Sequence, residues 1–302
     1  MIYTVTFNPS LDYAMDFDEV VRGGLNRAKH ASITAGGKGI NVSKVLTGLG
    51  VENLMLGFVA GFTGDEIERS LSREGYRSEF IRLERGTSRI NVKVNTGEMT
   101  ELNAGGPEIP KNAVEKLHTQ LDRLNKGDFL VLAGNIPEGM PEFTYNLIID
   151  KMNAKGVKTV VDASGSVLMS SLQYSPFLIK PNRQEISELF SIRLSGPENA
   201  EKYLRQLQAK GAGNILLSLD KEGAVLLTEE GELFYRPAPE GNVINSVGAG
   251  DSMVAGFLWG YIETGDYREA LVCAVSAGSA SAFSHGFASG ADIRALKGLL
   301  GI

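Results

Sequence analysis

Short runs of apolar and β-branched residues alternate with helical patterns along most of this 302-residue chain. The apolar runs cover residues 2–8, 53–60, 128–135, 157–164, 177–182 and 214–220. Segments with helical periodicity, most of them ending at glycine or asparagine, cover residues 39–50, 64–75, 110–125, 141–156, 250–265 and 267–286. Alternation of this kind is typical of βαβ units. We therefore expect an α/β fold with a doubly wound, mainly parallel sheet and helices on both faces.

Two segments, residues 10–37 and 87–106, break this rhythm and have the pattern of hairpins. The second contains the alternating run RINVKV, a turn at residues 95–97 (Asn-Thr-Gly) and then EMTELN. We predict that the two segments form a small β-sheet that stands off the main domain as a lid; ordinary surface hairpins are the alternative. No repeat or low-complexity linker divides the chain, so residues 1–302 are expected to form one domain.

The composition narrows the range of partners. Apolar residues make up 43% of the chain, charged residues make up 22%, and the formal net charge is −6. Because no block of Lys and Arg occurs, we expect neither nucleic acid nor a membrane as a partner. Cys273 is the only cysteine, which excludes an internal disulfide and a cysteine-rich metal site. With no signal-like leader and no long apolar run, a cytoplasmic protein is expected.

Glycine-rich loops precede two of the predicted helices. One lies in NSVGAGDSMVAGF (245–257) and the other in AGGKGINVSK (35–44). A dinucleotide-binding loop requires a third glycine where Met253 stands, and a P-loop requires Ser or Thr directly after Lys38. The sequence therefore excludes both of these loops. Each loop still opens a helix whose first N–H groups lack partners and carry partial positive charge, so each suits an anion.

Asp251 directly follows the later of the two loops. A kinase that phosphorylates a small alcohol needs N–H donors and cations around the transferred phosphoryl group. It also needs a carboxylate that takes the proton of the acceptor hydroxyl. Asp251 could be this carboxylate, with the N–H groups around Ala249 and Gly250 on the phosphoryl group. Aspartate is also a common N-cap, so the loop alone leaves both interpretations open.

Four motifs, taken together and in order, resemble one protein family. They are TFNPSLD (6–12), AGGKGINVSKVL (35–46), KPNRQE (180–185) and VGAGDSMVAGF (247–257). The chain resembles the ribokinase-like carbohydrate kinases of the PfkB family over essentially its whole length. This resemblance implies the ribokinase-like fold, with ATP and Mg²⁺ as cofactors. The NPSLD, GGKGIN and SRINVKV runs are similar to the branch whose members phosphorylate fructose 1-phosphate or tagatose 6-phosphate.

The resemblance assigns roles at the reaction centre. Asp251 is the catalytic base, and the anion hole is formed by Gly248, Ala249 and Gly250. The residues that hold sugar hydroxyls are Asp12, Gly37 and Asn41. An acidic protein with an anionic substrate also needs local cations, for which the candidates are Lys38, Arg89 and Arg27. Asp12 could instead close a turn, and Arg89 could be an outward-facing charge on an alternating strand.

A second set of residues is assigned to the nucleotide. In the family, the Asn-x-x-Glu pair, here Asn182 and Glu185, orders Mg²⁺ and its water. The same pair could form a helix capping box. The other candidates for ATP binding are Lys180, Ser218, Gly223, Val275 and Ser279, although Val275 and Ser279 could equally be core residues. Asp220 stands where the family usually has glycine, so it is not assigned to the nucleotide.

The resemblance implies an ATP-dependent phosphorylation of D-fructose 1-phosphate at its 6-hydroxyl. Tagatose 6-phosphate is the nearest alternative substrate, because it requires the same cations for its phosphate, the same hydrogen-bonding residues for its hydroxyls and the same base. A sensor of sugar phosphates on a kinase-like fold is a third possibility, although a sensor would not need the base. The partners are thus a small sugar phosphate and a nucleotide. A homodimer formed through the lid is also expected, since exposed sheet edges invite pairing.

Overall fold

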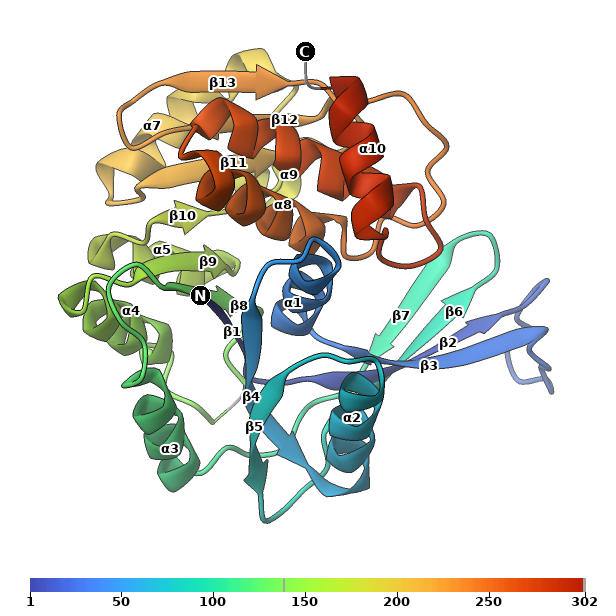
Figure 1. Cartoon of the computed structure of the whole chain (residues 1–302). Coiled ribbons are helices and arrows are strands. Elements are labelled where there is room, and N and C mark those ends of the chain that lie inside the picture. The colour runs from blue at the N-terminus through green and yellow to red at the C-terminus, as the bar shows by residue number, and fades with distance from the viewer. Residues whose placement is uncertain (138, 301–302) are drawn as a thin grey trace.

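The computed structural model describes residues 1–137 and 139–300, and its main feature is a nine-stranded sheet (Figure 1). The strand order is β13-β12-β11-β10-β9-β8-β1-β4-β5. The strands are β1 (Ile2–Thr6), β4 (Asn53–Ala60), β5 (Ser78–Leu83), β8 (Phe129–Ala133), β9 (Lys158–Asp162), β10 (Leu178–Ile179), β11 (Asn214–Ser218), β12 (Ala224–Leu227) and β13 (Leu233–Arg236). All neighbours from β11 to β5 are parallel, whereas β12 and β13 are antiparallel.

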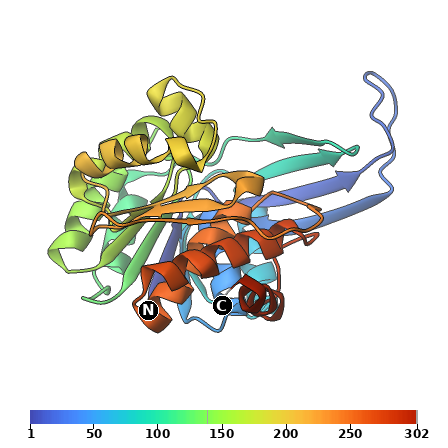
Figure 2. The same ribbon diagram turned by 90° about the horizontal axis from the view of Figure 1, so that it is seen from above.

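Helices cover both faces of this sheet, which gives three layers (Figures 1 and 2). One face packs against α1 (Lys38–Gly48), α2 (Gly61–Arg73), α8 (Ala249–Thr264), α9 (Tyr267–Ala282) and α10 (Gly290–Leu300). The other packs against α3 (Lys111–Leu121), α4 (Thr144–Ala154), α5 (Gly165–Ser171), α6 (Arg183–Phe190) and α7 (Glu201–Ala209). No helix in the part of the chain that the structure describes is long and apolar enough to cross a bilayer.

The predicted alternation of strands and helices is confirmed. Each of the six apolar runs contains a strand of the large sheet, and each helical segment contains a helix. The sequence analysis missed β5, β12, β13, α5, α7 and α10. The missed β5 is an edge strand in which buried and exposed positions mix, so it lacks the continuous apolar character of β4, which is buried throughout.

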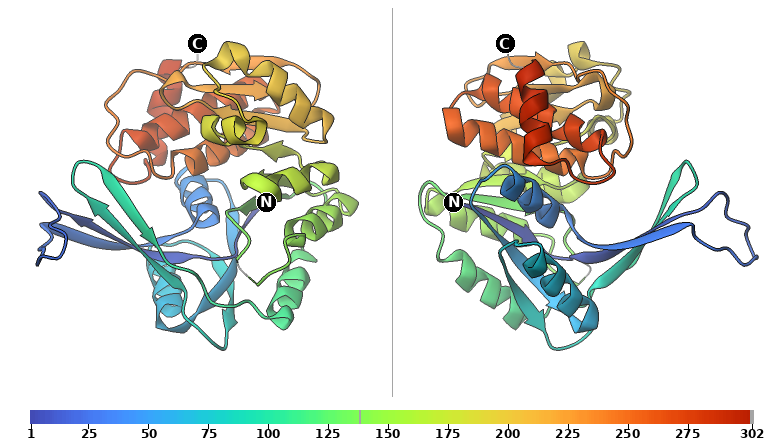
Figure 3. Two further views of the ribbon diagram at one scale, coloured as in Figure 1. Left: turned by 180° about the vertical axis from the view of Figure 1, so that it is seen from behind. Right: turned by 45° about the vertical axis from the view of Figure 1, so that its right-hand side comes forward.

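The two predicted hairpin segments meet in a second, four-stranded sheet that projects from the main body (Figures 1 and 3). Its strands, in the order β3-β2-β6-β7, are β2 (Ser10–Asp16), β3 (His30–Gly36), β6 (Arg89–Asn95) and β7 (Met99–Asn103). The β2–β3 and β6–β7 pairs are antiparallel hairpins, and the parallel β2–β6 pair joins them. The prediction of a small separate sheet is therefore confirmed.

The small sheet has two chemically different faces. Its register places Tyr13 opposite Ile33 and Val92, so this face is apolar. The next position along β2 places Asp12 opposite Asn91, so the other face is polar. Because side chains alternate along a strand, residues two positions apart share a face of the sheet. Of the candidate sugar-binding residues, Asp12 and Arg89 lie on the polar face.

Candidate active site

The candidate active site lies where the parallel strands of the large sheet end. Asp162 is the last residue of β9, Lys180 directly follows β10, and Ser218 is the last residue of β11. In open α/β sheets, ligands bind outside the carboxyl ends of the strands. The N-termini of α1 and α8 contribute the two glycine loops to the same region, and α1 and α8 pack against each other.

The N-terminus of α8 provides unpaired backbone donors. Gly248 caps the helix with φ 80°, in the left-handed region that favours glycine. The N–H of Ala249 is already used, because it donates to the carbonyl of Ser246 at 3.2 Å. Within residues 1–137 and 139–300, no acceptor lies within hydrogen-bond distance of the N–H groups of Gly250 and Asp251. The N–H groups of Gly248, Gly250 and Asp251 thus have no hydrogen-bond partner among the described residues, whereas that of Ala249 already has one in Ser246.

Asp251 is the third residue of α8 and does not cap it. Its carboxylate faces α1 and accepts a hydrogen bond from Asn41 Nδ2 at 2.8 Å. The side chain is almost completely buried. Burial and the nearby charge of Asp162 raise the pKa of Asp251 to about 7, although the Asn41 hydrogen bond and the charges of Lys38 and Lys180 oppose this rise. Such a pKa suits a general base that works near neutral pH.

Asp162 is a functional residue that the sequence analysis missed. It is 1% exposed, and its Oδ1 lies 3.2 Å from Lys38 Nζ and 3.4 Å from Lys180 Nζ. Burial alone would raise the pKa of Asp162, but the two ammonium groups lower it. Likewise, burial would lower the pKa of Lys38, but the charges of Asp162 and Asp251 raise it. Lys38 therefore stays charged beside the ionised carboxylate of Asp162.

A cavity of about 840 Å³ opens beside the N-terminus of α8. Its lining includes all six residues predicted to bind ATP, which are Lys180, Asn182, Ser218, Gly223, Val275 and Ser279. Gly250 also lines it, and a β-carbon at Gly250 would lie 3.0 Å from Lys180 Nζ. The ammonium group of Lys180 thus lies against the glycine loop, next to its unpaired N–H groups.

Asn182 and Glu185 form the capping box that the sequence left open. Asn182 Oδ1 accepts from the backbone N–H of Glu185 at 2.8 Å, and the backbone N–H of Asn182 donates to Glu185 Oε2 at 2.8 Å. This box begins α6 at the rim of the cavity. Among the described residues, no group of three or more His, Cys, Asp or Glu side chains could hold a metal ion.

The sugar half of the site centres on Asp12, on the polar face of the small sheet. Its Oδ1 accepts hydrogen bonds from Ser10 Oγ at 2.7 Å and Asn91 Nδ2 at 3.0 Å. Its Oδ2 lies 3.1 Å from Lys93 Nζ, an ion pair that the sequence analysis missed. A β-carbon at Gly36 would come within 2.5 Å of this carboxylate, which explains the glycine there. The neighbouring Gly37 caps α1 with φ 130°.

The three predicted phosphate-binding cations lie in different places. Lys38 is the first residue of α1 and pairs with Asp162. Arg89 is half-buried at the start of β6; its Nε donates to the carbonyl of Asn8 at 3.1 Å, and burial lowers the pKa of Arg89. Arg27 is exposed in the loop that joins β2 to β3, at the outer end of the small sheet (Figure 3). The structure therefore brings Lys38 and Arg89 toward the site but not Arg27.

A buried carboxylate beside unpaired N–H groups, with two lysines and a large cavity, is the equipment that a phosphotransferase acting on an alcohol group requires. The chain matches the model of the pfkB family carbohydrate kinases over residues 5–294. It is 41% identical over 284 residues to a 1-phosphofructokinase of Bacillus subtilis, which covers 94% of this chain and 93% of that protein. The chain therefore belongs to the pfkB family of carbohydrate kinases.

Two further relatives bear on the substrate. A D-tagatose-1-phosphate kinase of Bacillus licheniformis is 36% identical over 288 residues, which cover 95% of this chain and 94% of that protein. Among solved structures, phosphofructokinase-2 from Escherichia coli in complex with substrates and products is 26% identical, with a TM-score of 0.94. That likeness covers 100% of this chain and 99% of the neighbour. A ribokinase of Arabidopsis thaliana, 17% identical, superposes with a TM-score of 0.79 over 98% of each chain, so the predicted ribokinase-like architecture is confirmed.

Proposed function

We propose that this protein transfers the terminal phosphoryl group of ATP to the 6-hydroxyl of D-fructose 1-phosphate, which yields fructose 1,6-bisphosphate. The observation that carries the proposal is the buried Asp251, with a pKa of about 7, beside the unpaired N–H groups at the head of the cavity. The likeness to a 1-phosphofructokinase over 94% of the chain supports the choice of sugar.

In this proposal Asp251 takes the proton of the acceptor hydroxyl as the oxygen attacks phosphorus. Negative charge on the transferred group is stabilised by the N–H groups of Gly250 and Asp251 and by the ammonium groups of Lys38 and Lys180. The protein needs little covalent chemistry beyond this proton transfer, because positioning and electrostatics carry most of the catalysis. Asn41 orients the base through its hydrogen bond.

The residues around the cavity fit ATP with magnesium. An adenine ring needs an apolar wall, which Val275 and Ser279 of α9 can provide, and the phosphates need Lys180 and the N-terminus of α8. When bound, magnesium neutralises charge on the phosphate oxygens. The chain offers Glu185 with Asn182, and Mg²⁺ commonly keeps several waters and phosphate ligands, so an ion held through water fits this donor set.

The polar face of the small sheet supports binding of a phosphorylated sugar. Asp12 can accept hydrogen bonds from sugar hydroxyls, as can Asn41, while Arg89 and Lys38 supply positive charge for the phosphate. The parent sugar without its phosphate would leave Arg89 without an anionic partner, since Arg89 forms no ion pair within the described residues, whereas Lys38 already pairs with Asp162. This charge pattern supports a sugar phosphate over a free sugar such as ribose.

A tagatose phosphate is the second candidate substrate. Tagatose 6-phosphate is the rival that the motifs imply, but the B. licheniformis relative is named for D-tagatose 1-phosphate. D-tagatose differs from D-fructose only in the configuration at C4, and both would carry the phosphate on C1. The likeness to this relative therefore favours tagatose 1-phosphate over tagatose 6-phosphate as the second candidate.

We also propose that two copies of the chain associate through their small sheets. The apolar face of the small sheet leaves large side chains exposed, among them Ile33 at 59% and Leu102 at 58%. An exposed apolar patch of this kind on a soluble domain marks an interaction surface. Sedimentation equilibrium tests the proposal, and a monomer at micromolar concentration would contradict it.

A coupled ADP-release assay with ATP and magnesium tests the proposed activity. The acceptors are fructose 1-phosphate, tagatose 1-phosphate, tagatose 6-phosphate, fructose 6-phosphate and free ribose. We expect the highest kcat/KM for fructose 1-phosphate. A higher value for either tagatose phosphate would keep the mechanism and change the substrate. Nucleotide binding in a titration, without turnover of any acceptor, would instead favour a sensor of sugar phosphates.

A further inference from the structure

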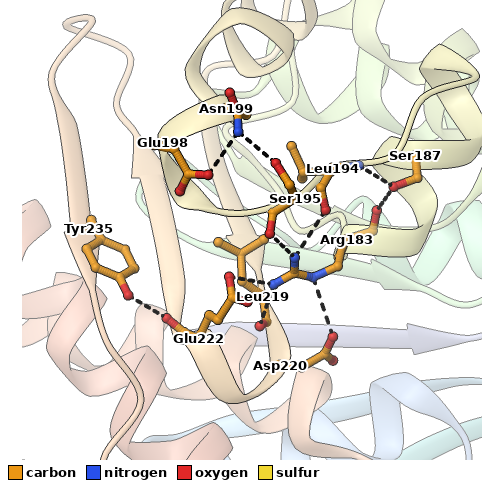
Figure 4. Close-up of polar contacts among 10 residues, drawn as sticks. All are labelled: Arg183, Ser187, Leu194, Ser195, Glu198, Asn199, Leu219, Asp220, Glu222 and Tyr235. Atoms are coloured by element: carbon orange, nitrogen blue, oxygen red, sulfur yellow. Dashed lines mark hydrogen bonds and ion pairs between the residues drawn. The ribbon is translucent and has the colours of Figure 1, made fainter.

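A polar network centred on Arg183 joins three segments at the nucleotide end of the molecule (Figure 4). Arg183 is the first residue of α6 and directly follows the capping residue Asn182. Its Nη1 donates to the carbonyls of Leu194 and Ser195, both at 3.1 Å. Its Nη2 donates to the carbonyl of Leu219 at 3.2 Å. The guanidinium thus connects the start of α6 by hydrogen bonds to two segments, the loop that follows α6 and the residue that follows β11.

The same guanidinium also holds the turn between β11 and β12. Arg183 Nη2 lies 2.8 Å from Glu222 Oε2, and Arg183 Nε lies 3.9 Å from Asp220 Oδ2. Both carboxylates belong to the short 3₁₀ turn Asp220–Glu222, which lines the cavity together with Arg183 itself. Figure 4 shows these side chains pointing toward the guanidinium from the turn. Tyr235 of β13 adds one hydrogen bond to the carbonyl of Glu222, at 2.8 Å.

This turn has a strained backbone and an exposed tip between Leu219 and Gly223, which are buried. Asp220 has φ 52°, in the left-handed region that non-glycine residues rarely adopt, and its side chain is 81% exposed. Gly223 ends the turn with φ 92°, where a β-carbon would come within 2.0 Å of the Arg236 carbonyl oxygen. An exposed turn of this kind needs an anchor to keep a single conformation.

We propose that Arg183 is a positioning residue for the nucleotide: by fixing the turn 219–223 against α6, it sets the shape of the nucleotide end of the cavity. A planar guanidinium with five donors can serve three carbonyls and a carboxylate at once. A lysine at this position keeps the positive charge but lacks the planar set of N–H donors that reaches several acceptors at once. The identity of the ligand, an adenine nucleotide, rests on the proposed function.

Isothermal titration with ADP tests this inference without requiring turnover. The variants are Arg183→Met and Arg183→Lys, with Arg205→Met as the matched control. Arg205 lies on α7, pairs with Glu201 and donates to the carbonyl of Gly231, away from the cavity lining. We expect the Kd for ADP to rise about tenfold in Arg183→Met and by an intermediate factor in Arg183→Lys. The control should stay within about twofold.

Kinetics then separate positioning from a general structural role. The KM for ATP should rise with the Kd for ADP, while the KM for the sugar phosphate and the kcat at saturating ATP stay within about twofold. Unchanged ADP binding in Arg183→Met, or equal losses for both substrates, would overturn the inference. If Arg183→Met does not fold, Glu222→Gln removes the ion pair from the turn instead, and unchanged ADP binding there overturns the inference equally. A wild-type protein that binds no adenine nucleotide would refute the proposed function and this inference with it.

Discussion

The two halves of the site hold their carboxylates in opposite ways. On the nucleotide side, Asp251 is buried in α8 and accepts one side-chain hydrogen bond, from Asn41. On the sugar side, Asp12 sits on the small sheet and contacts three side-chain donors, which are Ser10, Asn91 and Lys93. The carboxylate of Asp251 is therefore buried with one side-chain donor, whereas the carboxylate of Asp12 has three.

This difference matches two different tasks. A carboxylate that must take a proton needs a raised pKa and a vacant lone pair, and burial gives Asp251 a pKa of about 7. A carboxylate that must orient a sugar needs a fixed position, which its three donors give Asp12. The same residue type is therefore suited to act as a base where it is buried with few donors, as at Asp251, and to orient a sugar where several donors fix it, as at Asp12.

Asp251→Asn is expected to have the largest effect. The amide cannot accept the hydroxyl proton, so kcat should fall by about 10³-fold, the usual range for removal of a general base. In the wild-type enzyme kcat should rise with pH through about 7, because the base must be deprotonated. The kcat is measured across pH for both proteins, with ADP binding as the control for the fold. A variant with near-wild-type turnover would show that Asp251 is not the base.

The same substitution should stabilise the fold at high pH. The folded-state pKa of Asp251 is raised above its ordinary value, so its contribution to stability is present below the unfolded pKa and is lost as the pH rises through about 7. Above pH 7 the ionised, buried carboxylate therefore costs stability, and asparagine carries no such charge. Thermal unfolding at pH 8 and pH 5 measures this effect. We expect the Tm of Asp251→Asn to exceed that of the wild type at pH 8 only.

Asp162→Asn should have the next largest effect. It removes the negative charge that holds Lys38 and Lys180, and misplaced catalytic groups cost roughly 10-fold to 10²-fold in kcat. The loss of this charge also lowers the pKa of Asp251, which faces the two lysines, so the acidic limb of the pH profile should move to lower pH. A matched control is Asp122→Asn, an exposed carboxylate paired with Lys151. An unshifted pH profile would contradict the electrostatic role.

The sequence predicts those parts of the site whose residues lie close together in the chain, and it misses those that only the fold brings together. Asp251 and the glycine loops follow one another in the chain, so their pattern is visible without a structure. Asp162 is a single aspartate at the end of a buried strand, and it pairs with Lys38, a residue 124 positions away. Only the sheet order, with β9 between β8 and β10, places it in the site. The same limit applies to Arg183, whose partners lie on three separate segments.

The fold shows the same dependence on local signals. The buried parallel strands were predictable because both of their faces are covered, which requires a continuous apolar run such as β4. The strand β13 has the burial pattern of an edge, with alternating exposed and half-buried residues, and was missed. The hydrogen bond from the N–H of Ala249 to the carbonyl of Ser246 could not be predicted, because this turn has no sequence signature of its own.

Arg89→Ala tests the sugar half with a smaller effect. Arg89 supplies a planar cation next to the polar face of the small sheet, and a charged hydrogen bond of this kind is worth about tenfold in affinity. The KM for fructose 1-phosphate should therefore rise about tenfold, with the KM for ATP nearly unchanged. Arg77→Ala removes an exposed arginine that pairs with Glu52 and serves as the control. Equal increases in both KM values would indicate damage to the fold.

Lys93→Met should give the smallest effect and sharpens the comparison between the two carboxylates. It removes one of the three donors around Asp12 and leaves those of Ser10 and Asn91 in place. Because two donors still fix the carboxylate, we expect the KM for the sugar phosphate to rise about threefold, with kcat within about twofold of wild type. Steady-state kinetics with the sugar phosphate as the varied substrate measure both values. A loss in kcat as large as that of Asp162→Asn would mean that Asp12 takes part in the chemical step. The proposed difference, in which Asp251 takes the proton and Asp12 only orients the sugar, would then be wrong.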